Sequence, residues 1–306
     1  MLSPRLRWKL ARYRERAQDF FLALIRPQPR PRVCFSCGRL VGAAERACSH
    51  CGASQAPLSL SAFKRVALAV IPAENPLTYA LLFANLLFFA VAWVKSLQLG
   101  SSEGVAGGLF DLNAQVLLAL GAKFGYAVTA EGEYWRLVMP IFLHAGLIHF
   151  GFNSFVLWQV GPQVEELFGS RRFLFLYLVT GVAGFVVSTW WYGPGGLSVG
   201  SSGSIFGLIG ILIAYITQRS GFASEYRASL IRWAVFILVI GLFLGADNAA
   251  HAGGLASGLV LGRLVSARRP VSPADRFTVG LMAWGSAAVI AWSVAMVLLH
   301  LPPAGS

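Results

Sequence analysis

Long apolar bands separated by short polar connections dominate the hydrophobic pattern of this chain. Each band holds about 20 residues, the length that an α-helix needs to cross the hydrocarbon core of a bilayer. The bands lack the alternating pattern of membrane strands, and helices are the other structure that satisfies its own backbone in lipid. The pattern therefore predicts an all-α polytopic membrane protein. We place about seven spans, near 77–97, 143–164, 172–192, 203–218, 231–246, 248–265 and 277–299. The bands 203–218 and 231–246 are short, and we expect the other bands to enclose them.

Composition agrees with a lipid environment, and charge indicates an orientation. Of the 306 residues, 56% are hydrophobic and 12% are charged, and the formal net charge is +12. Thirteen Lys and Arg residues precede Pro76, and further basic residues follow the second, fourth and sixth bands, whereas the opposite connections carry few. By the positive-inside rule, we expect the N-terminus in the cytoplasm and the C-terminus, after an odd number of spans, outside. The charge is thus topogenic and argues against nucleic-acid binding. The expected location is a bacterial cytoplasmic membrane, and an organellar membrane is the open alternative.

A basic segment, residues 1–32, precedes the first apolar band. Its apolar residues are interspersed with arginines, so an amphipathic helix on anionic lipid and a loosely ordered arm are both open interpretations. Pro27, Pro29 and Pro31 end the arm as a stiff linker.

The four cysteines of the chain fall into two C-x-x-C knuckles with ten residues between them. Four thiolates on two tight turns make a tetrahedral zinc site, and the alternatives are disulfides or redox thiols. A cytoplasmic location disfavours stable disulfides. Residues 33–53 are therefore predicted to form a small zinc-ribbon-like module that holds structural zinc and offers a surface to a cytosolic partner. The predicted ligands are Cys34, Cys37, Cys48 and Cys51.

A turn of small residues, Val199–Gly203, runs directly into the fourth band. A serine at such a junction lies at a helix N-terminus, where free backbone N–H groups and the helix dipole favour negative charge. Acyl transfer to serine develops an oxyanion at such a place. Ser202 is therefore a candidate nucleophile, and the alternative is an ordinary loop with a helix N-cap.

Polar side chains also lie within the second band. His149 and Asn153 are four residues apart and share one helix face, either as functional groups or as a hydrogen-bonded contact between helices. Glu165 lies at the cytoplasmic end of the band, where we expect it to act as a structural cap against Arg171 or Arg172.

The connection 98–140 is too polar and too rich in glycine to cross a membrane. Its stretch Leu112–Leu120 is apolar enough to lie in the membrane interface. Tyr134 and Trp135 are expected at headgroup depth, with Arg136 hydrogen-bonded to loop carbonyls or phosphates.

The sixth band begins near His251 and carries a stripe of glycines at every fourth position. The stripe is Gly254, Gly258 and Gly262, and the matching stripe on the fourth band is Gly203, Gly207, Gly210 and Ala214. Two such stripes allow helix backbones to touch. Both bands descend from the outer side, so this contact predicts that His251 lies beside Ser202 as base beside nucleophile.

Four motifs in this order resemble the signature set of the rhomboid intramembrane serine proteases. They are Trp135-Arg136, His144-x4-His149-x3-Asn153, Gly200-Ser201-Ser202-Gly203 and Ala250-His251-x2-Gly254-x3-Gly258. The resemblance implies a six-helix protease core over residues 76–268, followed by a seventh transmembrane helix and an outer tail over residues 269–306. Residues 54–75 would link this core to the zinc-ribbon-like module, which the resemblance does not imply.

The resemblance also implies a role for each matching residue. Ser202 would be the nucleophile and His251 the general base, with no cofactor for catalysis. His149, Asn153 and backbone N–H groups around Ser201 and Ser202 would form the oxyanion hole. Supporting positions would be His144, Trp135 and Arg136 of the outer loop and Glu165 of the structural polar set. Position 206 is phenylalanine, where some members carry a tyrosine against the histidine, so ring stacking is retained without the hydroxyl.

The implied activity is hydrolysis of peptide bonds in the transmembrane helices of single-span membrane proteins, near the outer interface of the bilayer. A catalytically silent relative that binds membrane clients is the alternative, and Ser202 and His251 argue against it because both are present. A transporter or channel is disfavoured, because the sequence shows no internal repeat with corresponding broken helices.

Overall fold

The computed structural model describes residues 32–33, 39–42, 45, 48–52, 74–99, 110–218, 224–267 and 272–301. The chain divides into two compact units, Met1–Val70 and Ile71–Ser306. In the first unit, β1 (Arg32–Val33) and β2 (Leu40–Val41) pair antiparallel, with Arg32 opposite Val41. Residues 1–31 of the N-terminal arm, residues 54–73 of the linker and the predicted ligands Cys34 and Cys37 lie outside the described residues.

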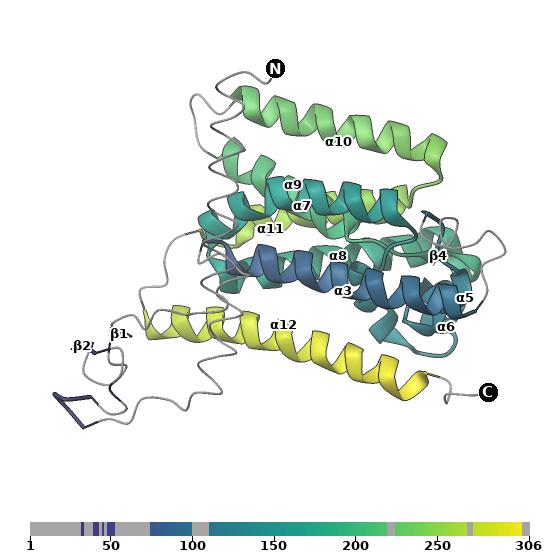
Figure 1. Ribbon diagram of the computed structural model, residues 1–306. Coiled ribbons are helices and arrows are strands. Elements are labelled where there is room, and N and C mark those ends of the chain that lie inside the picture. The colour runs from purple at the N-terminus through teal and green to yellow at the C-terminus, as the bar shows by residue number, and fades with distance from the viewer. Residues whose placement is uncertain are drawn as a thin grey trace, which may run out of the picture. The chain divides into compact units, whose positions relative to one another are not determined.

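The described residues of the second unit contain seven long helices, and Figure 1 shows them side by side. They are α3 (Pro76–Gln98), α7 (Leu147–Phe168), α8 (Ser170–Tyr192), α9 (Ser202–Thr217), α10 (Ser224–Leu244), α11 (Asn248–Leu264) and α12 (Pro273–His300). Each predicted band carries one of these helices, so the helical nature of the bands is confirmed.

Not every helix is long and apolar enough to cross a bilayer alone. Within the described part of the chain, α3, α8, α10 and α12 meet that requirement, and a fifth span arises if α7 is joined to the short helices before it, with a bend of 85°. Helices α9 and α11 have 16 and 17 residues. The structure supports an integral membrane protein with four or five candidate spans, and the count of seven stays a prediction.

The centre of the bundle is the contact between α9 and α11. A Cβ added to Gly254 would lie 2.0 Å from the carbonyl oxygen of Gly203, and one added to Gly258 would lie 2.0 Å from that of Gly207. Only hydrogen fits at such positions, so the two backbones touch along the glycine stripes. Every residue of α9 from Gly203 to Ala214 is buried, so most of the band 203–218 is enclosed, whereas Thr217 and Gln218 are exposed.

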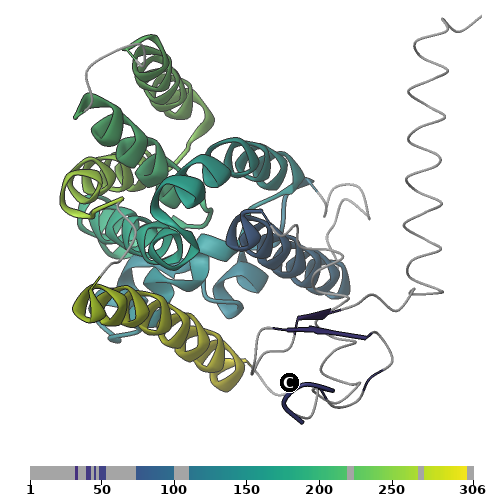
Figure 2. The same ribbon diagram turned by 90° about the vertical axis from the view of Figure 1, so that its left-hand side faces the viewer.

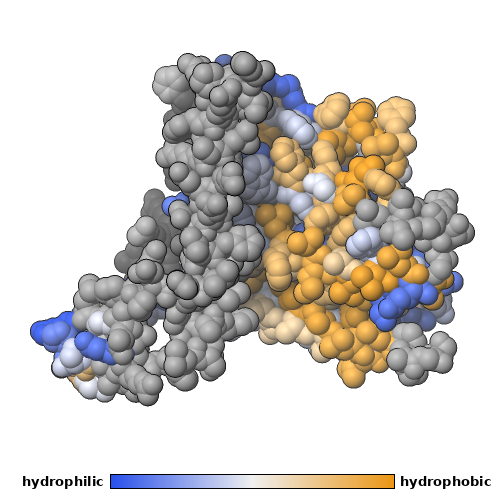
Figure 3. Space-filling model, viewed as in Figure 1, coloured by the Kyte–Doolittle hydropathy of each residue, from blue (hydrophilic) through white to orange (hydrophobic). Residues whose placement is uncertain are grey.

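The expectation that the band 231–246 is enclosed is wrong. Helix α10 begins earlier, at Ser224, and has 21 residues. It presents exposed Phe236, Leu242 and Phe243. In Figures 1 and 2, α10 and α12 lie at opposite edges of the bundle. The space-filling view of Figure 3 shows a largely hydrophobic surface over the helices, as lipid contact requires.

Glu165 does not pair with the arginines that follow it. Its carboxylate accepts hydrogen bonds from the backbone N–H of Leu77 at 3.0 Å and of Thr78 at 2.7 Å, and from the Thr78 hydroxyl at 2.7 Å. These groups are at the start of α3, where free N–H groups and the helix dipole favour an anion. Glu165 is therefore a structural cap, as expected, but it caps α3 and not its own helix end.

Short elements of the connection between α3 and α7 form a compact layer beside the bundle, which we call the outer layer. They are α5 (Ala114–Ala119), β3 (Lys123–Phe124), α6 (Gly125–Thr129), η1 (Tyr134–Leu137) and η2 (Met139–Phe142). After α8, η3 (Gly193–Gly195) and β4 (Leu197–Ser198) follow, and β3 pairs antiparallel with β4.

This layer has a hydrophobic core that it shares with α3 and α12. Leu112, Val116 and Leu117 are buried together with Trp135, whose exposed fraction is 1%. Trp135 and the apolar face of the stretch Leu112–Leu120 therefore pack inside the protein, whereas Ala114, Gln115 and Tyr134 are exposed. The buried apolar side chains are satisfied by one another, an arrangement that sequence periodicity cannot distinguish from contact with lipid. The depth of this segment in the membrane stays a prediction.

Candidate active site

The first residue of α9 and the fourth residue of α11 meet near one end of the glycine contact. The Oγ of Ser202 lies 2.8 Å from the Nε2 of His251. Ser202 is half-buried and His251 is 5% exposed. Ser202 lies at the N-terminus of α9 because the turn at Gly200, with φ of +130°, redirects the chain into the helix.

The other ring nitrogen of His251 contacts a residue that the sequence analysis did not single out. Nδ1 lies 3.2 Å from the Oδ1 of Asn248, and the Nδ2 of Asn248 donates to the carbonyl of Leu238 at 2.9 Å. The amide is thereby oriented with its oxygen toward the ring, so Nδ1 carries the proton. Nε2 is then the unprotonated nitrogen, and the Ser202 hydroxyl donates to it. The sequence signal for this contact is the spacing, because Asn248 lies three residues before His251 on the same helix face.

A ring contact and the cap of its helix hold the histidine in place. The ring of Phe206 stacks on His251 with centroids 4.5 Å apart and an interplanar angle of 8°, so the expected stacking is confirmed. Asp247 caps α11, because its carboxylate accepts from the backbone N–H of Ala250 at 2.9 Å and from the hydroxyl of Ser188. The start of α11 is thus fixed both to its own backbone and to α8.

Buried Lys123 also lies within electrostatic reach of Asp247 from the outer layer. Its side chain is 0% exposed, and its ammonium nitrogen lies 5.8 Å from the ring centroid of Tyr192. Burial lowers the pKa of Lys123 below its ordinary value, and the Asp247 carboxylate partly opposes this shift.

His149 and Asn153 both face the turn that precedes Ser202. A Cβ added to Gly200 would lie 2.8 Å from the Nε2 of His149 and 3.5 Å from the Nδ2 of Asn153. Ala145 donates its backbone N–H to the Nδ1 of His149 at 3.4 Å, which leaves the proton on Nε2. The Nδ2 of Asn153 is buried and has no hydrogen-bond partner among the described residues. Two N–H donors from one face of α7 are therefore directed at the serine turn.

Ser201 and His144 hold this turn from its inner side. Ser201 is 0% exposed and its Oγ lies 3.5 Å from the Nε2 of His144, which is itself 0% exposed. The backbone N–H of Gly200 donates to the carbonyl of Pro140 at 2.8 Å. The Ser201 hydroxyl is thus directed into the protein, away from the Oγ of Ser202.

The remaining predicted residues lie apart from the serine and histidine. Trp135 and Arg136 belong to η1 in the outer layer, and the Arg136 guanidinium donates to the carbonyls of Leu118 at 2.7 Å and Ala122 at 3.3 Å. The expected bonds from Arg136 to loop carbonyls are therefore confirmed. Glu165 lies at the start of α3. The described residues contain no group of three or more His, Cys, Asp or Glu side chains that could hold a metal ion.

Comparison with known proteins identifies the family. The rhomboid domain model matches residues 131–268. Rhomboid protease GluP of Bacillus subtilis is 40% identical over 152 residues, which cover 48% of this chain and 29% of that protein. RHOMBOID-like protein 1 of Arabidopsis thaliana is 36% identical over 159 residues, which cover 50% of this chain and 40% of that protein. The match thus spans less than half the length of these two relatives.

A shorter relative is matched over most of its length. The putative rhomboid protease YdcA of Bacillus subtilis is 33% identical over 156 residues, which cover 50% of this chain and 78% of that protein. Residues 131–268, which the rhomboid domain model matches, contain the serine turn, the α7 donors and the α11 histidine. Together with the match to most of YdcA, this shows that the chain belongs to the rhomboid family.

Proposed function

We propose that this protein is an intramembrane serine endopeptidase that cleaves transmembrane helices of other membrane proteins with a dyad of Ser202 and His251. The observation that carries the proposal is the 2.8 Å contact between the Ser202 hydroxyl and the unprotonated Nε2 of His251. A nucleophile within hydrogen-bond distance of a base that a third group orients is the arrangement that covalent catalysis requires.

The chemistry follows from these positions. His251 takes the hydroxyl proton as the Ser202 oxygen attacks a peptide carbonyl carbon, and the carbonyl oxygen becomes an oxyanion. The oxyanion collapses, the carbon–nitrogen bond breaks, and the leaving amine takes the proton from His251. Water then attacks the acyl-enzyme with His251 again as the base, which releases the second product and restores the serine.

The oxyanion would be held by donors that are in place before the reaction. The Nε2–H of His149 and the Nδ2 of Asn153 both face Gly200, beside the nucleophile. One such donor contributes about 3 kcal/mol to transition-state stabilisation when it is preorganised. Backbone N–H groups at the start of α9 add to the same electrostatic field. The side chain of Ser201 is assigned to positioning the turn, because its hydroxyl faces His144.

The substrate must present an extended segment. A helix hides its carbonyl groups in backbone hydrogen bonds, so a transmembrane substrate has to unwind locally before Ser202 can attack. Glycine or proline near the scissile bond lowers the cost of unwinding. By the predicted topology, cleavage occurs near the outer face of the membrane.

Covalent labelling tests the proposal directly. A serine-directed fluorophosphonate should label the purified full chain at Ser202. The variants Ser202→Ala and His251→Ala should lose both labelling and cleavage of a single-span model substrate, while the matched control Ser201→Ala should keep labelling. A folded chain that binds such a substrate without labelling or cleavage would instead support the silent client-binding alternative.

For the first unit we propose a structural zinc site of Cys34, Cys37, Cys48 and Cys51. Cys48 and Cys51 fit one half of such a site, because they lie on a tight turn closed by a 2.8 Å hydrogen bond from Gly52 N–H to the Cys48 carbonyl. Gly52 has φ of +72°, which favours glycine. When bound, zinc would supply folding energy to a segment too short to fold by apolar burial. Elemental analysis should find one zinc per chain, and variants with serine at Cys48 and Cys51 should contain none.

A further inference from the structure

The seventh long helix ends inside the outer layer that lies beside the serine turn. Val297 of α12 is 4% exposed and belongs to the same hydrophobic cluster as Trp135 and Met139, with Val294 packed against it. The last turns of α12 are therefore part of the core of this layer. The apolar composition that marks α12 as a candidate span does not predict this contact.

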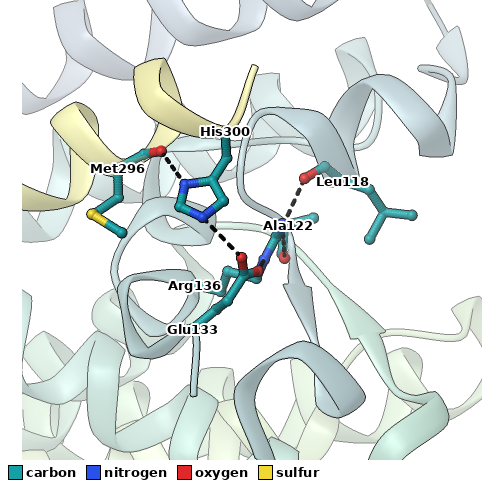
Figure 4. Close-up of polar contacts among 6 residues, drawn as sticks. All are labelled: Leu118, Ala122, Glu133, Arg136, Met296 and His300. Carbon is teal, nitrogen blue, oxygen red and sulfur yellow. Dashed lines mark hydrogen bonds and ion pairs between the residues drawn. The ribbon is translucent and has the colours of Figure 1, made fainter. Parts of the chain in front are cut away.

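His300, the last residue of α12, joins the helix to the segment around η1 (Figure 4). Its Nδ1 lies 2.8 Å from the carbonyl oxygen of Met296, and its Nε2 lies 3.4 Å from a carboxylate oxygen of Glu133. The imidazole ring also packs on Trp135, with centroids 5.4 Å apart. The other carboxylate oxygen of Glu133 accepts from Arg136, so one carboxylate is shared between two side chains.

Both ring nitrogens of His300 thus face groups that only accept hydrogen bonds. A neutral imidazole carries one N–H, whereas the imidazolium carries two and can donate to both acceptors at once. The position at the C-terminus of α12 also favours a cation. Because the side chain is 42% exposed, protons from solvent reach it.

Within the described residues, Glu133 is the carboxylate that contacts His300, and buried Lys123 is a further basic residue of the same layer. Arg136 is the nearby cation, and the Glu133 carboxylate lies between it and His300. Helix η2 has no ionisable side chain. On α8, the charged residues are Arg171 and Arg172 in the first turn, at the end opposite to η3 and the outer layer.

We propose that His300 ties the end of α12 to Glu133 and Trp135 of the outer layer, a contact that we call the clasp. The clasp is strongest when His300 is protonated. His300 is then a positioning residue for the serine turn. The connection runs from Trp135 through Met139 to Pro140, whose carbonyl accepts the 2.8 Å hydrogen bond from the backbone N–H of Gly200. Gly200 in turn faces the two donors of α7. The clasp belongs to the fold, and only its effect on turnover rests on the proposed function.

Amide hydrogen exchange of residues 133–142 tests the clasp without any substrate. The full chain in detergent micelles is compared with His300→Phe, which keeps a ring against Trp135 but has no donor, and with His300→Arg, which stays cationic. Leu299→Ala is the matched control, because Leu299 is 77% exposed on the same turn. The ratio of exchange rates between two variants at one pH cancels the ordinary pH dependence of exchange.

At pH 5.5 the His300→Phe variant should exchange about two- to fivefold faster than the wild type, the effect expected for one partly exposed ion pair. At pH 8.0 the difference should be smaller, because the neutral imidazole donates to one acceptor at most, and His300→Arg should remain protected at both values. Equal exchange at both pH values, or a difference that does not change with pH, would overturn the proposal.

The ratio of kcat/KM between the wild type and His300→Phe on a model substrate gives the second readout. It should follow the exchange ratio with pH, because the response of the catalytic histidine is common to both enzymes. If exchange responds but kcat/KM does not, the clasp stands and its role in positioning the serine turn is overturned. If no cleavage occurs at all, the exchange result still decides the clasp.

Discussion

Adding one methyl group at Gly254 should separate the serine from the histidine. In Gly254→Ala the new Cβ would lie 2.0 Å from the Gly203 carbonyl oxygen and 2.8 Å from its carbon, and both are backbone atoms that cannot rotate away. Relieving the overlap requires the two helices to move apart by about 1 Å or more, since non-bonded contacts are favourable only near 3.5 Å. Gly254 lies one turn after His251, so this movement stretches the 2.8 Å contact to Ser202 beyond hydrogen-bond distance.

The expected result is a loss of about 100-fold in kcat/KM, which is the order of effect of a 1 Å misplacement of catalytic groups. Overpacking should also lower the free energy of unfolding by about 1–3 kcal/mol. Cleavage, fluorophosphonate labelling and the thermal midpoint are measured on the same preparation. Gly280→Ala on α12 is the control, because a Cβ there meets nothing within 4 Å. A Gly254→Ala variant that labels and cleaves within twofold of the wild type would refute the argument that backbone contact sets the dyad distance.

Four further predictions concern single residues or the chain ends. Asn153→Ala and His149→Ala should each lower kcat by about 100-fold while the serine still labels, because they remove oxyanion donors and not the nucleophile. Asn248→Ala should lower kcat about tenfold or more with little change in KM, because the base loses the group that fixes its tautomer; normal kcat would show that Phe206 stacking suffices. Glu165→Gln should reduce the free energy of unfolding by about 1.5–3 kcal/mol without changing labelling, and an unchanged thermal midpoint would contradict its role as the cap of α3. A tag at the N-terminus should be accessible only from the cytoplasm and one after His300 only from outside, and accessibility of both from one side would show that the count of spans is not odd.

The sequence pattern predicted the features of the fold that follow the helical periodicity. Apolar bands located the seven long helices, and the stripes through Gly203 and Gly254 predicted which two helices touch. Because a helix places every fourth residue on one face, that contact also predicts that Ser202 and His251 are close. The distance of 2.8 Å between their side-chain atoms agrees with this inference. Whether the pair is catalytic is a question for the labelling experiment.

The features that the sequence did not predict depend on contacts between distant segments. Glu165 was assigned to nearby arginines, but its carboxylate caps a helix that begins 89 positions earlier, at Pro76. Trp135 has the composition of an interfacial anchor, yet it is enclosed by apolar residues from both sides of the connection. Helix α10 has a short apolar band but extends toward its N-terminus through polar residues and lies at the edge. A one-dimensional pattern shows how apolar a segment is, and it does not show whether lipid or protein covers it.

The distribution of charge at the start of α11 explains why a neutral amide faces the histidine. Two adjacent polar residues, Asp247 and Asn248, precede His251. The carboxylate of Asp247 is used for the cap and for the hydroxyl of Ser188, where backbone and side-chain donors satisfy it. The amide of Asn248 fixes the tautomer of His251 with a dipole, so no second charge has to be desolvated beside the dyad. A carboxylate at position 248 would stabilise the imidazolium more strongly, but it would cost its own desolvation. Its second oxygen would also face the α10 carbonyl of Leu238, which now accepts from the amide and would lose its donor. Within a membrane protein, the amide gives the orientation that the base requires without burying an additional charge.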